Sequence, residues 1–549
     1  MSLVLRPLAC LVVLLAFLFG CEAVEDFWYH GDVGLPGQEE VVAPGEPDTI
    51  PPQEVGPADT GEGRPDAFDR DVSDRDESAP ETVSPPEELD NLIDEGTFLI
   101  VAPAEMAEAY EDLADWRRRT GLPTRIVTME EIDAAAATPD RARALRDYLR
   151  GEHERGTEIV LLGGNTPDVP HREVEMKMSI GGGGLFYEHE TVAASELYFS
   201  DLYGDWERVE IVEEPEGGPT LRPDVAVGRV PAENAAEVAA YVAKVIDYER
   251  ELAADYQDEV LFISEPTGYF DIDSSLMLDT YTRKFGGGYN IEKLYSDTTH
   301  YPDAKPNSAE AQVESLERGV NVILHFGHGL ETILGALRVA DVEALSHAPR
   351  YNVYASCACY SGDFAYSGGR AVGADYILNP EGGGVAYLGN TDVGIGFPPG
   401  ALFVGDAVWL AMLSETPLRL GVAFAEARRL VFPVTGSGAA EADRYTQLVV
   451  VLLGCPALRM WPSRPLVATL AAPPTLAAGD ALVAEVSVGG EPVAGAVVTL
   501  YRQSELLLVT TSDEFGVARF RHDAPLWGSY DLTVSGAGVQ PIESSVTFE

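Results

Sequence analysis

Residues 321–326 read Asn-Val-Ile-Leu-His-Phe and are followed by Gly327-His328-Gly329. An apolar run of this length, closed by glycine, predicts a strand that is buried on both faces of a sheet. Similar runs alternate with helical patterns along the chain. The predicted strands are 97–101, 124–128, 158–162, 224–227, 259–264, 290–295 and 321–326, and the predicted helices include 141–155, 235–248, 274–285 and 309–318. This alternation predicts an α/β domain, with a parallel sheet covered by helices on both faces and its chemistry on loops at the carboxyl ends of the strands.

The pattern changes near Leu466, where helical spacing stops and short alternating strands begin. These strands are predicted at 482–488, 496–501, 506–511, 517–521 and 529–534. They indicate a small β-sandwich, and the turns around Gly495 and Gly516 resemble those of immunoglobulin-like modules in secreted bacterial proteins. We therefore expect four parts: a lipoprotein-type signal peptide (1–21), a disordered tether (22–95), an α/β domain (96–465) and an immunoglobulin-like β-sandwich (466–549).

Composition excludes several classes of function. The chain has 549 residues, of which 46% are hydrophobic, so most of it can bury a core. Its 90 acidic and 37 basic residues give a formal net charge of −53. Such a surface repels phosphate backbones, so we expect no nucleic-acid partner. Residues 22–95 are rich in proline and acidic side chains, which predicts an extended, self-repelling tether.

The first 21 residues predict export. Arg6 precedes an apolar run from Leu8 to Phe19, which is too short to cross a bilayer because a spanning helix needs about 20 residues. Leu18-Phe19-Gly20-Cys21 resembles a bacterial lipobox, in which the cysteine is acylated and becomes the mature N-terminus. The sequence thus predicts a lipid anchor on Cys21 and a place in the cell envelope or on the cell surface. The alternative is an ordinary secretory signal that happens to contain a cysteine.

Two strand ends carry the residues suited to catalysis. His328 lies between two glycines, which allow sharp turns and close approach of a ligand. A second predicted strand, in the stretch 352–364, runs into Cys357 and Cys359. A thiol and an imidazole from neighbouring strand ends can form a nucleophilic pair. The structural alternative is that the histidine only makes hydrogen bonds within the fold and that the cysteine is a small buried apolar residue. We expect such a structural role for His325. The spacing of His325, His328, Cys357 and Cys359 does not match a zinc site.

The α/β part resembles the gingipain family of secreted bacterial cysteine peptidases, whose fold is related to that of caspases. The resemblance runs from about Thr97 through Trp461 and continues into the terminal sandwich. It rests on Phe98–Pro103, Leu113–Arg117, Val160–Gly164, Tyr198–Trp206, Val227–Pro231, Gly327–Gly329 and Ala358–Phe364, in this order. The resemblance implies an endopeptidase acting on polypeptides, with no cofactor required.

The resemblance also implies roles for individual residues. Cys359 would be the nucleophile, because the family places Gly-Asp-Phe three residues after the catalytic cysteine, and His328 the general base and acid. The backbone amides of Gly329 and Cys359 would form the oxyanion hole. Glu196 lies near the acid that orients the histidine in the family, with Asp201 as the second choice.

The resemblance also bears on substrate specificity and on activation. Gingipains proper cleave after Arg or Lys by means of a pocket carboxylate, and Asp205 lies near that part of the pattern. The family's Gly-Asp-Pro is replaced by Gly454-Cys455-Pro456, and we recognise no folded propeptide before Thr97.

Relatives can bind structural calcium, but no spacing in this sequence indicates a calcium-binding loop. We expect the protein to be a monomer. The alternatives to a peptidase are a catalytically silent surface protein that binds polypeptides and an acyl or peptidyl transferase.

Overall fold

The computed structural model describes residues 98–182, 185–206, 219–250, 255–266, 274–395, 402–413, 418–430, 438–502, 506–522 and 524–549. The predicted signal peptide, the predicted lipidation site Cys21 and the predicted tether lie outside these residues. Within them, no helix combines the length and the apolar composition needed to span a bilayer.

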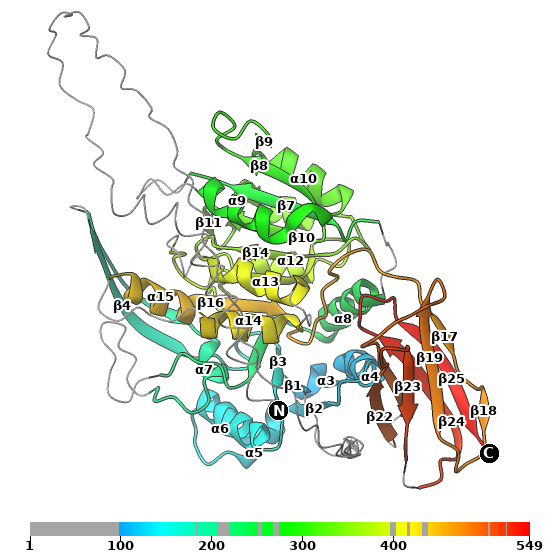
Figure 1. Ribbon diagram of the computed structural model, residues 1–549. Coiled ribbons are helices and arrows are strands. Elements are labelled where there is room, and N and C mark those ends of the chain that lie inside the picture. The colour runs from blue at the N-terminus through cyan, green and yellow to red at the C-terminus, as the bar shows by residue number, and fades with distance from the viewer. Residues whose placement is uncertain are drawn as a thin grey trace, which may run out of the picture. The chain divides into compact units, whose positions relative to one another are not determined.

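An 11-stranded sheet forms the centre of the α/β part, in the order β2-β1-β3-β6-β16-β15-β14-β10-β7-β8-β9 (Figure 1). Its strands are β1 (Phe98–Ala102), β2 (Thr124–Thr128), β3 (Ile159–Gly163), β6 (Ala226–Val230), β7 (Glu259–Ser264), β8 (Asn290–Tyr295), β9 (Lys305–Pro306), β10 (Val322–Phe326), β14 (Asn352–Ser356), β15 (Gly384–Asn390) and β16 (Val450–Gly454). All neighbours are parallel except β15 and β16, which are antiparallel. The prediction of a parallel sheet therefore holds within two halves that run in opposite directions.

Helices cover both faces of this sheet. They are α3 (Ala104–Ala107), α4 (Glu111–Arg119), α5 (Met129–Ala135), α6 (Arg141–His153), α7 (Leu197–Ser200), α8 (Ala235–Arg250), α9 (Ser274–Phe285), α10 (Ala309–Arg318), α11 (Val339–Glu343), α12 (Val372–Leu378), α13 (Phe403–Leu413), α14 (Leu420–Leu430) and α15 (Gly438–Val449), with short 3₁₀ turns η1 (Glu108–Tyr110) and η2 (Gly286–Gly288). Alternate residues of β1 pack into different cores, Phe98 and Ile100 into one and Leu99 and Val101 into the other. Because successive strand residues point to opposite faces, one core lies on each face.

Two small sheets that the sequence did not predict accompany the main sheet. The first is an antiparallel hairpin of β4 (Glu173–Gly182) and β5 (Leu185–Ala194). Apolar residues of β4 pack against Tyr445 and Leu448 of α15. The second is a three-stranded sheet of β11 (Gly329–Leu330), β12 (Ile333–Leu334) and β13 (Leu337–Arg338), which begins directly after His328.

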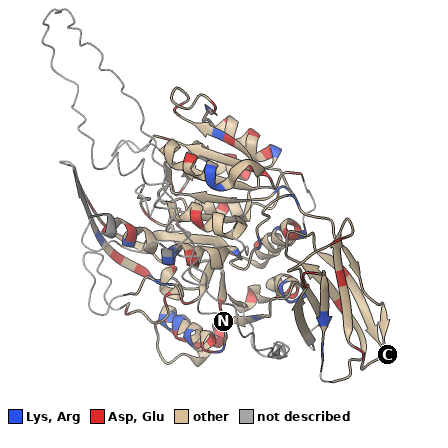
Figure 2. Cartoon of the chain, in the orientation of Figure 1, with Lys and Arg blue, Asp and Glu red and all other residues tan. Residues whose placement is uncertain are grey.

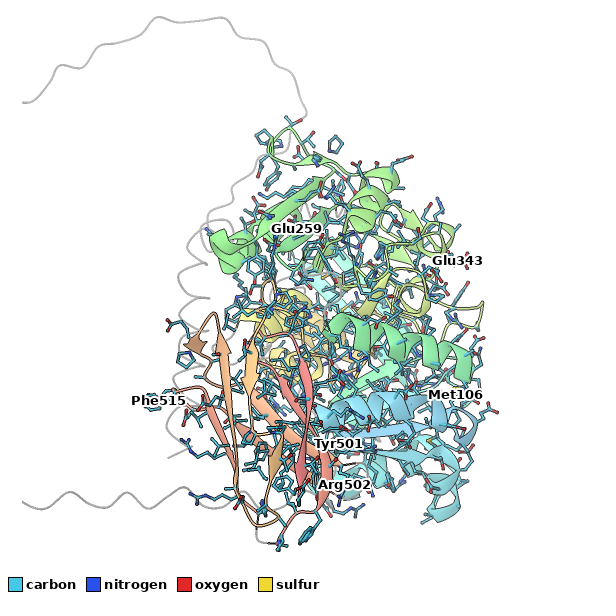
Figure 3. All side chains as sticks on the ribbon, turned by 90° about the vertical axis from the view of Figure 1, so that its right-hand side faces the viewer. Met106, Glu259, Glu343, Tyr501, Arg502 and Phe515 are labelled. Carbon is cyan, nitrogen blue, oxygen red and sulfur yellow. The ribbon has the colours of Figure 1, made fainter. Side chains whose placement is uncertain are left out.

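The C-terminal part consists of two sheets around one apolar core. One sheet holds β17 (Thr469–Ala471), β19 (Leu482–Val488), β20 (Glu491–Pro492) and β23 (Val517–Phe520), and the other holds β18 (Thr475–Leu476), β21 (Val497–Arg502), β22 (Leu506–Thr511), β24 (Gly528–Ser535) and β25 (Ile542–Phe548). This agrees with the predicted strands; the immunoglobulin-like assignment stays a prediction. Tyr501, marked in Figure 3, donates a hydrogen bond to Asp115 of α4 (2.8 Å), and a polar cavity of about 400 Å³ lies beside this contact.

Candidate active site

Three adjacent parallel strands bring the candidate residues to one edge of the sheet. β7, β10 and β14 are neighbours, and His325 of β10 is in register with Ser356 of β14. His328 and Cys359 each follow their member of this pair by three residues. The predicted pairing of a histidine and a cysteine from neighbouring strand ends is thus what the register produces.

His328 has a defined orientation. Its side chain is exposed, and its ring atom Nε2 lies 2.6 Å from the carbonyl oxygen of Pro266. A carbonyl oxygen can only accept, so Nε2 carries the hydrogen of this bond. Nδ1 is then the ring nitrogen that can take up a proton, as a general base must.

Glu265 supports His328, and the sequence did not single it out. It directly follows β7, and its Oε2 accepts the backbone N–H of His328 at 2.9 Å. Asn307 donates to its other oxygen at 3.3 Å, and Nε2 of His325 lies 3.6 Å from Oε2. Burial acts to raise the pKa of Glu265, but the neighbouring His325 and the His328 amide outweigh it and lower that pKa. The carboxylate is therefore held ionised beside the histidine.

His325 is buried in β10, in line with its predicted structural role. Its Nδ1 lies 2.9 Å from the hydroxyl oxygen of Ser356, which also accepts the N–H of Ala358 at 3.0 Å. These bonds join β10 to the start of the loop that carries Cys359.

Cys359 lies in a tight turn after β14, next to Tyr360 with its positive φ of 55°. Its Sγ accepts the N–H of Gly394 at 3.3 Å. Burial raises the pKa of the Cys359 thiol, the Gly394 amide lowers it, and the charge of Asp392 raises it again, so that the net direction is upward. The thiol therefore needs help from a base to ionise near neutral pH.

The loops of His328 and Cys359 are in contact through Gly329. A Cβ at Gly329 would come within 2.7 Å of the Cβ of Ala358 and 3.0 Å of the carbonyl oxygen of Cys359. Only glycine allows this approach. The amides of Gly329 and Cys359 thus belong to touching segments; their role as an oxyanion hole stays a prediction.

Cys357 is the less suitable nucleophile of the two. Its backbone N–H donates to the carbonyl oxygen of His325 at 3.0 Å and so continues the ladder between β10 and β14. Burial, followed by the nearby Cys359, raises the pKa of the Cys357 thiol. The structure therefore favours Cys359, in line with the choice made from the Gly-Asp-Phe spacing.

The structure does not bring Glu196 to His328. The carboxylate of Glu196 is buried and accepts a hydrogen bond from Nε of Arg229 at 2.7 Å, while burial raises its pKa. Asp201 accepts the backbone amides of Gly204, Thr220 and Leu221, so it fixes a loop. Glu196 is paired with Arg229, and the carboxylate that contacts His328 is Glu265, which accepts the backbone N–H of that histidine.

Arg229 contacts both Glu196 and the loop that follows Cys359. It is fully buried, and besides Glu196 it donates to the carbonyl oxygens of Gly164, Val169 and Pro170. Its guanidinium carbon lies 4.7 Å from the ring centroid of Phe364, in the loop that follows Cys359. The pair of Arg229 and Glu196 thus braces the catalytic loop from the other half of the sheet.

Acidic side chains gather near the cysteine, within a chain whose acidic residues are spread over many elements (Figure 2). Burial raises the pKa of Asp363 to about 6, and the charges of Glu331 and Asp392 add to this effect. Asp205, the predicted pocket carboxylate, is exposed and precedes Trp206, whose ring packs against Tyr198 of α7. Asp392 is the carboxylate whose charge acts on Cys359, and the pocket role of Asp205 stays a prediction.

The surroundings of Cys455 explain how a cysteine can replace the aspartate of the family's Gly-Asp-Pro. Cys455 is buried, and its Sγ accepts a hydrogen bond from the fully buried Arg117 at 3.5 Å. Glu249 forms an ion pair with Arg117 and accepts the indole N–H of Trp116 at 2.7 Å. Glu249 therefore neutralises the arginine without a carboxylate at position 455. Among the described residues, no three His, Cys, Asp or Glu side chains are arranged to hold a metal ion.

Comparisons with known proteins agree with this fold. The model of peptidase family C25 matches residues 93–461. The crystal structure of the Arg-specific cysteine proteinase gingipain R (RgpB) is similar to this chain with a TM-score of 0.65 and 18% identity, over 83% of this chain and 98% of that one. A complex of the pro- and mature domains of Porphyromonas gingivalis RgpB gives 0.64 and 16%, over 82% and 100%. A third structure, described as a protease, gives 0.62 and 17%, over 82% and 96%.

No curated protein matches the chain. The structural likeness, at these low identities, shows the caspase-like gingipain fold, and the family model covers most of the α/β part. The chain therefore belongs to peptidase family C25, the gingipain family of cysteine peptidases.

Proposed function

We propose that the chain is an exported, lipid-anchored cysteine endopeptidase that cleaves polypeptides after Arg or Lys. The observation that carries the catalytic part is the pairing of strand ends: His328, with Nε2 on the Pro266 oxygen, and Cys359, on the loop that touches Gly329. Membership of family C25 supports a peptidase. The signal and Cys21 support export and anchoring.

The reaction uses the chain's own groups at each step. Nδ1 of His328 takes the proton of the Cys359 thiol, and the sulfur attacks the carbonyl carbon of the peptide bond. The tetrahedral intermediate collapses when His328 protonates the amine that leaves, which gives a thioester on Cys359. His328 then removes a proton from water, whose oxygen displaces the sulfur and releases the carboxylate product.

The preference for a basic side chain rests on charge. Glu331, Asp363 and Asp392 are close enough to one another for their charges to affect the pKa of Asp363. A guanidinium or ammonium group next to Cys359 would meet a negative potential there, whereas an acidic side chain would be repelled.

A catalytically silent polypeptide-binding protein is the second candidate. The raised pKa of the Cys359 thiol favours it, because a buried thiol beside Asp392 ionises reluctantly. Matched peptide amides that differ only in an Arg, Lys, Gln or Leu before the scissile bond separate the two. We expect turnover of the Arg and Lys peptides, loss of it in Cys359→Ala and its retention in Cys357→Ala. Binding of the peptides without turnover would establish the second candidate.

A further inference from the structure

Residues 390–394, at the end of β15 and just after it, form hydrogen bonds with the turn that carries Cys359. The side-chain amide of Asn390 donates to the carbonyl oxygen of Ala358 (3.0 Å), and the N–H of Tyr360 donates to the carbonyl oxygen of Asp392 (2.8 Å). The N–H of Gly394 points at the Cys359 sulfur, 3.3 Å away. Residues 390–394 therefore hold the turn of Cys359 through three hydrogen bonds.

Gly394 has little freedom to move. A Cβ at this position would lie 2.0 Å from the carbonyl oxygen of Cys357 and 2.8 Å from the side-chain nitrogen of Asn390. The donor is thus packed against the backbone on the far side of the thiol. An N–H aimed at sulfur stabilises the thiolate more than the thiol, since it interacts with the charge.

Asp392, two residues earlier, is held by the β4–β5 hairpin. Its carboxylate is buried and accepts hydrogen bonds from Nε2 of His189 at 3.0 Å and from the hydroxyl of Thr191, both on one face of β5. It also accepts the N–H of Val393 at 2.6 Å. The hairpin therefore fixes both the side chain of Asp392 and the start of the segment that ends at Gly394.

A second contact strengthens this link. The hydroxyl of Thr391 donates to the carbonyl oxygen of Ala194, the last residue of β5, at 2.7 Å. The ring of His189 packs edge-on against Tyr445 of α15, with 5.8 Å between ring centroids. The hairpin thus contacts both the 390–394 segment and α15.

Among the described residues, Asp392, Tyr445 and Cys357 interact electrostatically with Cys359, and the Asp392 charge opposes ionisation of the thiol. His328, the proposed base, lies on the loop that contacts the Cys359 turn through Gly329, and it is the same in every variant compared below. The donors on His189 and Thr191 spread that charge. Loss of these donors and loss of the charge should therefore act on the thiol in opposite directions.

We propose that Asp392, held by His189 and Thr191, is a positioning residue that aims the Gly394 N–H at the Cys359 sulfur. The hairpin thereby controls how much thiolate is available for attack. The inference rests on the proposed function only in taking Cys359 as the nucleophile, since the geometry concerns the free thiol.

The test is the pH dependence of Cys359 alkylation by iodoacetamide in the full chain, with the modified cysteine assigned by peptide mass mapping. Thr191→Val removes an anchor and leaves the Asp392 charge, so we expect the midpoint to rise by about 0.5–1 pH unit and the rate at neutral pH to fall about three- to tenfold. His189→Phe keeps the ring edge against Tyr445 and should act in the same direction. Asp392→Asn keeps the shape without the charge and should lower the midpoint.

Thr120→Val is the matched control. It removes another buried hydroxyl, hydrogen-bonded to the Trp116 carbonyl oxygen on α4, and should leave the midpoint unchanged. A wild-type midpoint in folded Thr191→Val or His189→Phe, or a shift of the same sign in Asp392→Asn, overturns the proposal. Alkylation needs no substrate. If the variants show these shifts while the wild-type protein cleaves no peptide, the proposed function is refuted and this inference stands.

Discussion

The two halves of the central sheet use carboxylates in different ways. In the first half, Glu196 is matched by the fully buried Arg229, which also binds three backbone carbonyl oxygens. In the second half, Glu265 has an amide N–H, an asparagine amide and a histidine around it, and no arginine or lysine among the described residues forms an ion pair with it. A carboxylate near a predicted catalytic motif can therefore have one of two roles. A carboxylate paired with a buried arginine supports the fold, whereas one that contacts a histidine is available to support that histidine.

The largest effect is expected at His328. His328→Ala should lower kcat by about 10³-fold or more, because it removes the proposed general base for the Cys359 proton. The exposed side chain makes few packing contacts, so the free energy of unfolding should stay within about 0.5 kcal/mol of wild type. Kinetics with an arginine amide and urea unfolding measure both. A large loss of stability would mean that His328 is structural.

Arg229→Met should mainly reduce stability. It leaves Glu196 as a buried, unpaired charge, which typically costs about 3–5 kcal/mol. Denaturant unfolding measures this loss. The double variant Arg229→Met with Glu196→Gln should recover a large part of the stability. An unchanged unfolding free energy together with lost activity would instead place the pair in the chemistry.

Glu265→Gln should mainly reduce activity. A hydrogen bond to a charged group contributes about 1.5–3 kcal/mol, so kcat/KM should fall about 10- to 100-fold at pH 7. Glu196→Gln is the matched control and should change kcat/KM far less. If the two variants lose activity equally, the contrast between the halves is wrong.

The same variant has a stability signature in acid. The pKa of Glu265 is lowered in the fold, so its ionised form contributes stability that is fully present above the unfolded pKa of about 4.3 and is lost as pH falls through the lowered value. Glu265→Gln should therefore lose less stability than wild type between about pH 5 and pH 3. Thermal unfolding across this range measures the difference.

The smallest effect concerns Asp363. Its pKa is raised to about 6, so it ionises as pH rises through that value and makes the site more negative. The ratio of kcat/KM for an arginine peptide to that for a glutamine peptide should rise about threefold between about pH 5 and pH 7. Asp363→Asn should remove this rise. A rise that persists in the variant would assign the preference to other carboxylates.

Strands β7, β10 and β14 could be predicted because they are apolar runs followed by polar residues, whereas β15 of the same half was not predicted. Strands β7 and β8 and helices α9 and α10 have the predicted bounds. His328 and Cys359 could be chosen because glycines and a turn follow apolar strands, and parallel register then brings them together. The antiparallel junction of β15 and β16 could not, since a buried strand has the same apolar pattern in either direction.

The supporting carboxylate was missed although the sequence carried a signal for it, whereas the hairpin contacts could not be predicted from the sequence. Glu265 directly follows a predicted strand, and this position was the signal that could have found it. Glu196 lies in a recognisable motif, yet its partner Arg229 is 33 residues away and reaches it only in the fold. His189 and Asp392 are 203 residues apart, and nothing local in the sequence links them.

The most direct test of the account is covalent labelling of the full chain with an electrophilic peptide that carries arginine before a warhead that reacts with the attacking sulfur. We predict one adduct, on Cys359 by peptide mass mapping, whose formation is abolished in Cys359→Ala and strongly slowed in His328→Ala, with Cys357 and Cys455 unmodified. An adduct on Cys357, or arginine-peptide cleavage that persists in Cys359→Ala, would contradict the account.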